Sequence, residues 1–482
     1  MFERRDVWVL SDENKWHPTI EWYARAVGAL RGRDGTNFSD PTSWRYLAEV
    51  HGTDIAHGKW PKGATWDQCQ HSSWFFLPWH RMYLHHFERI VRKAIVDLGG
   101  PKDWALPYWN YWNPKKAAVR KLPPAFLAAK MPSGEANPLF TTERAASVKK
   151  GVAIHADAVS ADEAMAEGTF ISNGSGGFGG PVTGFSHAGA GVGSLENVPH
   201  GSVHVSVGGT QNPPGWMSRF ETAGRDPIFW LHHANIDRLW EAWLQGAGGR
   251  ANPADAKWLK MKFTIGSGTA VTTLSVKDVL TTTKAPLQYK YSDLSFPAPP
   301  PSRVLATKAD DALKARGEMP ADIPPEMVGA SKSHVPLTSS RSEVEISVAA
   351  PTGPLRAMAP GTRPRKVFLK IENVTGTSLA AGTYVVHVNL PRDADTAGAA
   401  HDDRRAGRIS MFGVPESTQS DEKHSGSGLT FSFDITALAH ELQQRRDWDP
   451  EHLRVSFTPV PGSDEGASGG DVRVGRVSLF YA

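Results

Sequence analysis

The sequence predicts two domains of different class: a mainly α domain over residues 1–296, a helical bundle, and an all-β sandwich over residues 343–482. In the first part apolar residues recur at helical spacing, and in the last part about seven short alternating segments are separated by turn residues. Residues 297–342 are rich in proline, alanine and charge, a composition typical of an exposed linker. With 482 residues and 40% apolar content, the chain has enough material for two cores.

Charge and cysteine content exclude several classes of protein. The formal net charge is only +3, and charges of both signs are interspersed, which argues against a dedicated nucleic-acid or membrane-surface protein. No apolar run approaches 18 residues and the first residues lack a signal-peptide pattern, so we expect a soluble, cytoplasmic protein. The single cysteine, Cys69, excludes an intrachain disulfide and cysteine-rich metal scaffolds. Histidine is therefore the plentiful metal ligand.

Helices are expected to deliver histidines in the first domain. Pro18 to Leu30 and Pro41 to Val50 show apolar residues at helical spacing, and the second run leads into His51. Thirteen of the nineteen histidines lie at or before position 233, and none lies from 234 to 333. We therefore expect the chemistry of this protein in its first part.

The segment 67–89 holds two histidines around a proline. Pro78 suits the first turn of a helix, which places His80 on that helix and His71 in the segment leading into it. Nine residues would put two histidines on opposite faces of one uninterrupted helix. Only a loop followed by a helix would let both reach one ion.

A second group of histidines follows. His200 and His204 are four apart, so on a helix their imidazoles leave the same face. The segment 226–240 offers His232 or His233 as a third ligand, but hardly both, since neighbours on a helix diverge by roughly 100°. Asp237 lies one helical turn after His233, where it could hold the other ring nitrogen of that histidine.

These motifs resemble the two copper sites of the type-3 copper family, which comprises tyrosinases, catechol oxidases and molluscan-type haemocyanins. The second site is matched by His-x-x-x-His followed by Asp-Pro-Ile-Phe-x-x-His-His-x-Asn-x-Asp-Arg, and the first by residues 67–89. The resemblance implies two copper ions. It assigns the first to His51, His71 and His80, and the second to His200, His204 and His233. His57 is an alternative to His51, and His232 is left as a packing or supporting residue.

The resemblance also implies a reaction. In the family, the copper pair activates dioxygen, and a phenolic small molecule docked beside it is oxidised to an ortho-quinone. Six imidazoles favour copper over magnesium, calcium or manganese, although zinc also binds imidazole, so a redox-inert zinc protein is one rival. A haemocyanin-like oxygen carrier is the other, and a single copper domain without repeats argues against it. Catechol oxidase and tyrosinase both remain open.

Several other residues gain expected roles from the resemblance. Cys69 stands where fungal members carry a cysteine joined through a thioether to the following histidine, here His71, although an ordinary buried thiol is the alternative. Phe220 aligns with a phenylalanine that gates the copper pair in plant catechol oxidases, or is simply a core aromatic. Glu196 matches a glutamate thought to hold a water and assist phenol deprotonation, and it also suits a helix start.

The residues that follow the second-site histidines bear on substrate choice. Gly201 stands where many tyrosinases have an asparagine, and glycine has no side-chain acceptor. The sequence therefore supports monophenol hydroxylation less firmly than diphenol oxidation. Val205, which follows His204, is apolar and does not distinguish between these two activities. Arg81 could tie the two copper helices together by pairing with Asp237, or form a surface salt bridge.

The last part of the chain is expected to cover the active site. The strands are expected at 344–349, 366–374, 384–390, 408–413, 429–435, 453–458 and 472–481. They resemble the carboxy-terminal domain of latent plant polyphenol oxidases. Before them, Tyr289-Lys-Tyr291 matches the tyrosine-x-tyrosine motif that closes the catalytic domain in plant and fungal relatives. We expect the carboxy-terminal domain to act as a shield, with a plugging side chain near Met411 and Phe412.

Overall fold

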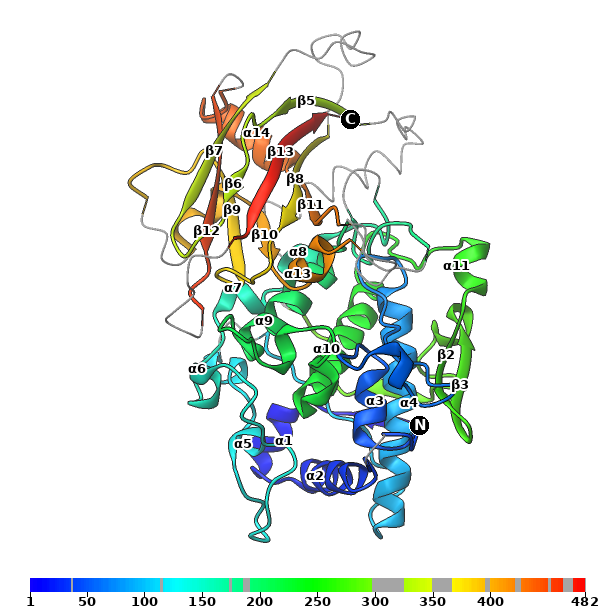
Figure 1. Cartoon of the computed structure of the whole chain (residues 1–482). Coiled ribbons are helices and arrows are strands. Elements are labelled where there is room, and N and C mark those ends of the chain that lie inside the picture. The colour runs from blue at the N-terminus through cyan, green and yellow to red at the C-terminus, as the bar shows by residue number, and fades with distance from the viewer. Residues whose placement is uncertain are drawn as a thin grey trace.

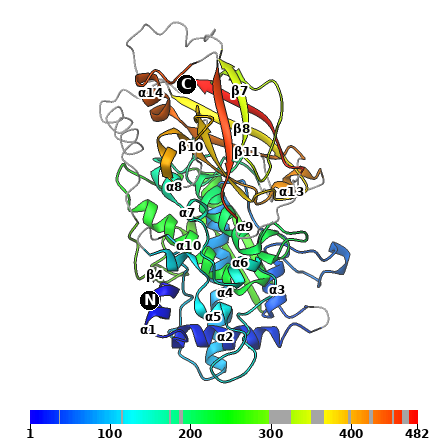
Figure 2. The same ribbon diagram turned by 90° about the vertical axis from the view of Figure 1, so that its left-hand side faces the viewer.

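The computed structural model describes residues 1–35, 38–112, 116–172, 176–184, 191–296, 325–348, 366–394, 399–420, 426–449, 452–462 and 471–481. The helical domain and the β domain are stacked end to end, and the helix α9 (Ser202–Gly208) lies between the centre of the helical domain and the sheet (Figure 1, Figure 2). None of the described helices is long and apolar enough to cross a membrane.

Two long buried helices form the centre of the helical domain. They are α4 (Phe76–Asp97) and α10 (Pro227–Leu244), and each has a proline in its first turn. Asp226 caps α10, because its carboxylate accepts the backbone N–H of Ile228 at 3.0 Å. The ring of Phe87 on α4 stacks on Trp230 of α10, so the two helices share one core.

Shorter elements surround this pair. The expected helices are present as α2 (Pro18–Arg31) and α3 (Trp44–Glu49). The others include α1 (Val7–Glu13), α5 (Pro124–Leu127), α6 (Ala146–Lys149), α7 (Ala156–Val159), α8 (Asp162–Ala166) and α11 (Ala256–Lys260). A hairpin joins β2 (Lys262–Ser267) to β3 (Ala270–Ser275). The strand β1 (Phe2–Arg4) pairs in parallel with β4 (Tyr289–Tyr291), which brings both ends of this domain together.

All seven expected carboxy-terminal segments contain a strand. They are β7 (Ser342–Val348), β8 (Val367–Thr375), β9 (Thr383–Val388), β10 (Arg405–Ser410), β11 (Leu429–Asp434), β12 (Leu453–Pro459) and β13 (Arg473–Tyr481). The helices α13 (Val414–Thr418) and α14 (Thr436–Gln444) interrupt this pattern.

The β domain begins earlier than the composition indicated. The strands β5 (Glu326–Ala330) and β6 (Val335–Pro336) lie in the stretch 297–342, which we expected to be linker, and both pair with β13. The alternation in β5 is short, with Val328 its one buried residue, so the sequence signal was weak. The rest of the expected linker, 297–324, lies outside the described residues.

The nine strands follow the order β10-β9-β12-β7-β5-β13-β8-β11, with β6 on β13. This sheet curls until its two ends meet: a Cβ at Gly407 on β10 would lie 2.3 Å from the ring of Phe433 on β11. The curled sheet encloses one apolar core, which includes Ile371, Val386 and Phe457. The outer edge of β10 faces the helical domain, where Asn197 bonds to it.

Candidate metal centre

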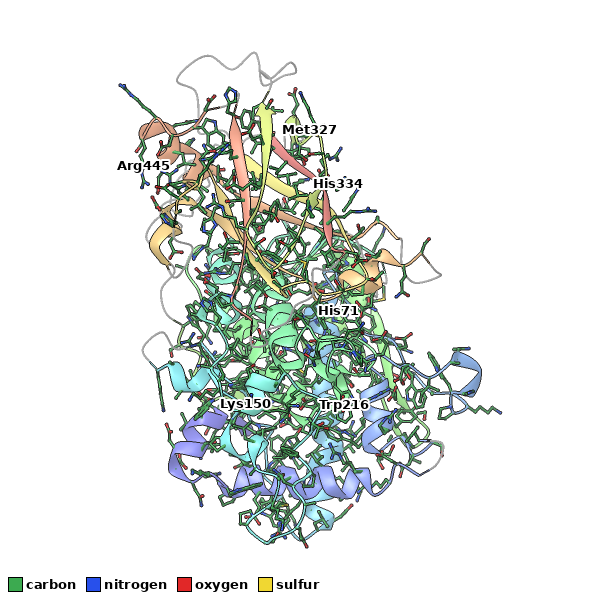
Figure 3. The ribbon with its side chains drawn as sticks, turned by 60° about the vertical axis from the view of Figure 1, so that its left-hand side comes forward. His71, Lys150, Trp216, Met327, His334 and Arg445 are labelled. Atoms are coloured by element: carbon green, nitrogen blue, oxygen red, sulfur yellow. The ribbon has the colours of Figure 1, made fainter. Side chains whose placement is uncertain are left out.

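Six buried histidines from separate segments converge near the junction of the two domains, where Figure 3 labels His71. Three come from the first half of the domain: His51 just after α3, His71 in the turn before α4, and His80 on α4. Three come from the second half: His200 in the helical turn Glu196–Gly201, His204 on α9 and His233 on α10. The loop-plus-helix arrangement expected for the first group is present.

The first three imidazoles form a compact triangle. The ring centroids of His51 and His71 are 5.3 Å apart, those of His71 and His80 are 5.3 Å apart, and those of His51 and His80 are 5.6 Å apart. Among the described residues, ligand atoms within 4.8 Å of one another join His51 to His80 and His233 in one group and to Cys69 and His71 in another, so His51 connects the other two rings.

The second group has similar dimensions. The ring centroids of His200 and His204 are 4.6 Å apart, and those of His233 lie 5.0 Å and 5.4 Å from them. The Nε2 atoms of His204 and His233 face each other at 3.2 Å. Two nitrogens converge in this way when they address a common point.

The two triangles are adjacent. His80 of the first group lies parallel to His233 of the second, with centroids 4.5 Å apart and planes inclined by 10°. His71 and His200 are 5.7 Å apart. The geometry is therefore that of a binuclear site rather than two independent sites.

Backbone carbonyls fix the orientation of four of these rings. The Nδ1 atoms of His51, His80, His200 and His204 lie 2.7–3.0 Å from the carbonyl oxygens of Phe220, Phe76, Glu196 and Met217. A carbonyl oxygen only accepts, so each Nδ1 carries the proton and each Nε2 has a free lone pair. The Nε2 atoms of His80 and His200 are buried and have no hydrogen-bond partner among the described residues. A metal would satisfy them.

The protonation states also suit metal binding. Burial lowers the pKa of His80, His200, His204 and His233 well below the usual value, and neighbouring imidazoles lower it further. Neutral imidazole is the form that binds metal. The metal-binding groups found among the described residues consist of histidines and Cys69. Such a donor set fits copper or zinc and not magnesium or calcium.

The two alternative histidines differ in position. His57 lies in an exposed turn, with its ring on Trp60 at 4.5 Å, outside these metal-binding groups, whereas His51 is fully buried in the cluster. His232 lies beside the second triangle, and its Nδ1 is 3.2 Å from the hydroxyl of Tyr111.

Among the described residues the buried Nδ1 atom of His233 has no hydrogen-bond partner, so the expectation that Asp237 holds this nitrogen is wrong. Its carboxylate instead accepts hydrogen bonds from Arg81 and from the hydroxyls of Tyr289 and Tyr291, each at 2.5 Å, and lies 3.3 Å from Arg4. Buried cations attract the carboxylate more strongly than a neutral imidazole would. The alternative role, pairing with Arg81 between α4 and α10, is present and fully buried.

Cys69 belongs to the first group of histidines. It is a buried free thiol, and its sulfur and a ring nitrogen of His71 lie within 4.8 Å of each other. The thiol and the imidazole are therefore neighbours in the folded chain.

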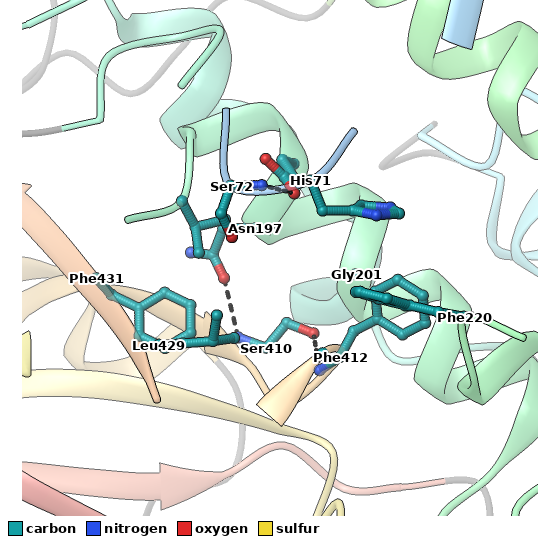
Figure 4. A pocket seen from close by; sticks show the side chains of 12 residues that line it. His71, Ser72, Asn197, Gly201, Phe220, Ser410, Phe412, Leu429 and Phe431 are labelled. Carbon is teal, nitrogen blue, oxygen red and sulfur yellow. Dashed lines mark hydrogen bonds between the residues drawn. The ribbon is translucent and has the colours of Figure 1, made fainter. Parts of the chain in front are cut away.

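Two phenylalanines cover the cluster from opposite domains (Figure 4). Phe220 stacks on His71, with ring centroids 4.2 Å apart and planes inclined by 18°. Phe412, after β10, stacks on His204 at 4.3 Å and touches Phe220 at 4.7 Å. The ring of Phe412 therefore occupies the open side of the second triangle.

Glu196, Gly201 and Val205 lie at the same boundary. Burial raises the pKa of Glu196 to about 8, although the backbone N–H of Ser72, 2.7 Å from Oε1, opposes the rise. A Cβ at Gly201 would lie 2.8 Å from Oγ of Ser410, so a larger residue would collide with the β domain. Val205 is 3% exposed and packs with the β-domain core.

Sequence reasoning missed the residues that hold the two domains together. Asn197 binds the backbone of β10, and Arg408 on β10 bonds to Asp157, Asp162 and Glu163. These partners are more than two hundred residues apart in the chain, and no local spacing relates them.

Comparison with known proteins follows the same division of the chain. The common central domain of tyrosinase matches residues 41–154 and 143–246, and a domain of unknown function (DUF7868) matches residues 324–482. Tyrosinase HcTyr1 of Hahella sp. (strain CCB-MM4) is 35% identical over 507 aligned residues, covering 99% of each chain. A chloroplastic polyphenol oxidase of Malus domestica is 27% identical over 92% of this chain and 72% of its own. The solved structure of latent apple tyrosinase (MdPPO1) has the same fold, with a TM-score of 0.63 and 22% identity over 100% of this chain and 97% of that one.

Proposed function

Because this chain belongs to the tyrosinase family, we propose that it is a dicopper phenol oxidase that uses O2 to oxidise ortho-diphenols to ortho-quinones. The observation that carries this proposal is the pair of adjacent, buried imidazole triangles. The relatives named above are a tyrosinase and polyphenol oxidases, so they give no support to an oxygen carrier.

Two copper ions fit the site. His51, His71 and His80 would hold one, and His200, His204 and His233 the other. The bound pair would supply the two-electron chemistry with O2. The chain itself holds four of the rings in the ligating tautomer through carbonyl oxygens, and it excludes water with aromatic residues.

The residues around the pair favour diphenols. Phe220 offers a flat apolar face beside His71, against which a phenol ring would pack. Glu196 is the carboxylate placed to accept a phenol proton once the site opens to water. Gly201 supplies no amide to assist it, so oxidation of diphenols should outpace hydroxylation of monophenols.

The β domain is proposed to keep the enzyme latent. The Phe412 ring stacks on His204 and contacts Phe220, where a substrate ring would otherwise lie. A phenol cannot enter while this side chain is in place. Displacing the β domain should therefore raise activity, most of all on bulky phenols.

Oxygen uptake by copper-loaded protein with a simple catechol tests both parts of this proposal. The measurement is made before and after brief proteolysis within residues 297–324. Uptake that rises on cleavage is the expected result. Equal oxygen uptake before and after cleavage would overturn the proposed latency but not the proposed oxidase activity. Reversible oxygen binding without catechol oxidation in either sample would overturn the oxidase.

The position of Cys69 supports a covalent cross-link beside the proposed copper site. We expect a thioether between Cys69 and His71 to form during copper loading, because the two side chains are close and buried. The peptide that contains both residues should be lighter by two hydrogen atoms, which O2 takes up, and its Cys69 should no longer react with a thiol-alkylating reagent. An unchanged mass and an alkylated Cys69 in fully copper-loaded protein would contradict the cross-link, and Cys69→Ser is the control.

A further inference from the structure

The contact between the helical domain and β10 has the character of a peptide-binding groove. β10 is the edge strand of its sheet, and its outer edge is recognised by side chains instead of by another strand. The side chain of Asn197 donates to the carbonyl oxygen of Arg408 at 2.7 Å. It also accepts the N–H of Ser410 at 2.9 Å (Figure 4). Glu163 accepts the N–H of Arg408 at 3.1 Å. These bonds read an extended backbone and not a particular side chain.

Side chains of the segment alternate between the two domains. Ile409 and Met411 are fully buried in the core of the β domain. Arg408, Ser410 and Phe412 point the other way, toward the helical domain. An extended chain has this period of two, so the groove selects every second residue.

The first selected residue is an arginine. The guanidinium of Arg408 reaches Asp157 at 2.7 Å, Asp162 at 2.9 Å and Glu163 at 2.8 Å. Its side chain is only 3% exposed and faces all three carboxylates, two of which, Asp162 and Glu163, also pair with Arg405 of the same strand. Charge-assisted hydrogen bonds of this kind are strong and specific for arginine.

In the middle of the groove, the side chains of Ser410 and Phe412 lie directly against Gly201. At Gly201 an added Cβ would lie 2.8 Å from Oγ of Ser410 and 3.1 Å from Cβ of Phe412. The glycine therefore provides the room in which the peptide passes. The groove ends at His204. The ring of Phe412, four residues after Arg408, stacks on this histidine.

A tyrosine differs from Phe412 by one hydroxyl group. We propose that the groove is also a substrate site of the opened enzyme, one that takes peptidyl phenols and catechols in an extended segment with an arginine four residues before the ring. This inference rests on the proposed phenol oxidase function. Two peptide catechols would each give up two hydrogen atoms to one O2, forming two ortho-quinones and two waters.

Copper-loaded Arg408→Ala/Phe412→Ala protein, opened by cleavage within residues 297–324, is the form to test, because its own segment has lost both the arginine and the ring. The probes are the hexapeptide Arg-Ile-Ser-Met-X-Gly, in which X is 3,4-dihydroxyphenylalanine, and the same peptide with glutamate in place of arginine. Oxygen uptake gives kcat/KM for each, and a simple catechol reports that the site is assembled. We expect the arginine peptide to exceed the glutamate peptide by about tenfold or more.

Two further substitutions in that background separate the parts of the groove. Asp157→Asn should move the ratio of kcat/KM between the two peptides toward one. Asn197→Ala should lower kcat/KM for both peptides relative to the simple catechol, because it removes the backbone bonds. Equal kcat/KM for the two peptides alongside normal catechol oxidation would overturn the peptide site and leave the phenol oxidase. Absence of catechol oxidation in every form would overturn both.

Discussion

The helical domain and the interface between the domains each contain a buried cluster of arginines and carboxylates, but the clusters differ in their surroundings. In the first, Asp237 binds Arg81 and two tyrosine hydroxyls inside the apolar core of one domain. In the second, Arg408 binds carboxylates of the other domain, and the side chain of Asp157 remains 25% exposed. Charges of the first cluster can meet water only if the domain unfolds. Those of the second can meet water when the domains separate.

The same chemistry should therefore stabilise a fold in one place and a closed state in the other. The inner cluster joins β1, α4, α10 and β4 through Arg4, Arg81, Asp237 and the Tyr289–Tyr291 strand. The outer cluster joins α7 and α8 to β10. Breaking each cluster in turn tests this distinction.

The largest effect on stability is expected for Asp237→Ala. It leaves Arg81 and Arg4 buried with one carboxylate fewer, which should lower the free energy of unfolding of the helical domain by about 3–5 kcal/mol. Sixteen of the 17 tryptophans lie at or before position 258, so tryptophan fluorescence during denaturant unfolding reports on this domain. The control is Asp97→Ala, whose exposed pair with Lys93 should contribute less than about 1 kcal/mol. Equal changes in the two variants would contradict the assignment.

Arg408→Ala should act on activity more than on folding. The closed state then holds Asp157 without its arginine and leaves Arg405 as the β10 arginine that pairs with Asp162 and Glu163, whereas the open state solvates all three carboxylates. A loss of about 3 kcal/mol from the closed state would raise the open population roughly a hundredfold. We expect catechol oxidation by the intact protein to rise, with little change in the unfolding of the helical domain.

The matched control for that experiment is Arg476→Ala. Arg476 pairs with Glu372 in the same β domain, but its side chain is 47% exposed and faces no other domain. It should leave the activity of the intact protein unchanged. If Arg408→Ala behaves in the same way as Arg476→Ala, the outer cluster does not hold the domains closed.

These clusters also mark where prediction from sequence succeeds and where it stops. Histidine spacing and strand alternation are local, so the helices around His80 and His233 and all seven expected strands could be predicted. The four-residue spacing between His233 and Asp237 was misleading, because Arg81 and Arg4, distant in sequence, attract the carboxylate. No local pattern relates Arg408 to Asp157, 251 residues away, or Asn197 to β10. Residues that act across the domain junction become visible only when the chain is folded.

A smaller effect, confined to the outer cluster, is expected from acid. Burial opposes ionisation of Asp157, but the Arg408 guanidinium outweighs it and holds the pKa below its ordinary value of 3.8. The closed state gains stability from this carboxylate above that value, and the gain is lost as the pH falls through the lower pKa of the closed state. The open state binds the proton more readily, so acid favours opening.

Brief incubation at about pH 3.5, followed by assay at neutral pH before the domains reclose, should raise catechol oxidation relative to a sample kept at about pH 6. The protein already cleaved within residues 297–324 corrects for any loss of copper. In Asp157→Asn the dependence on pH should weaken, because the residue that takes up the proton is gone. The inner Asp237 also has a lowered pKa despite burial, owing to Arg81. Protonation of Asp237 would instead appear as unfolding of the helical domain. If acid unfolds this domain without first raising activity, the inner cluster is less stable to acid than the outer cluster.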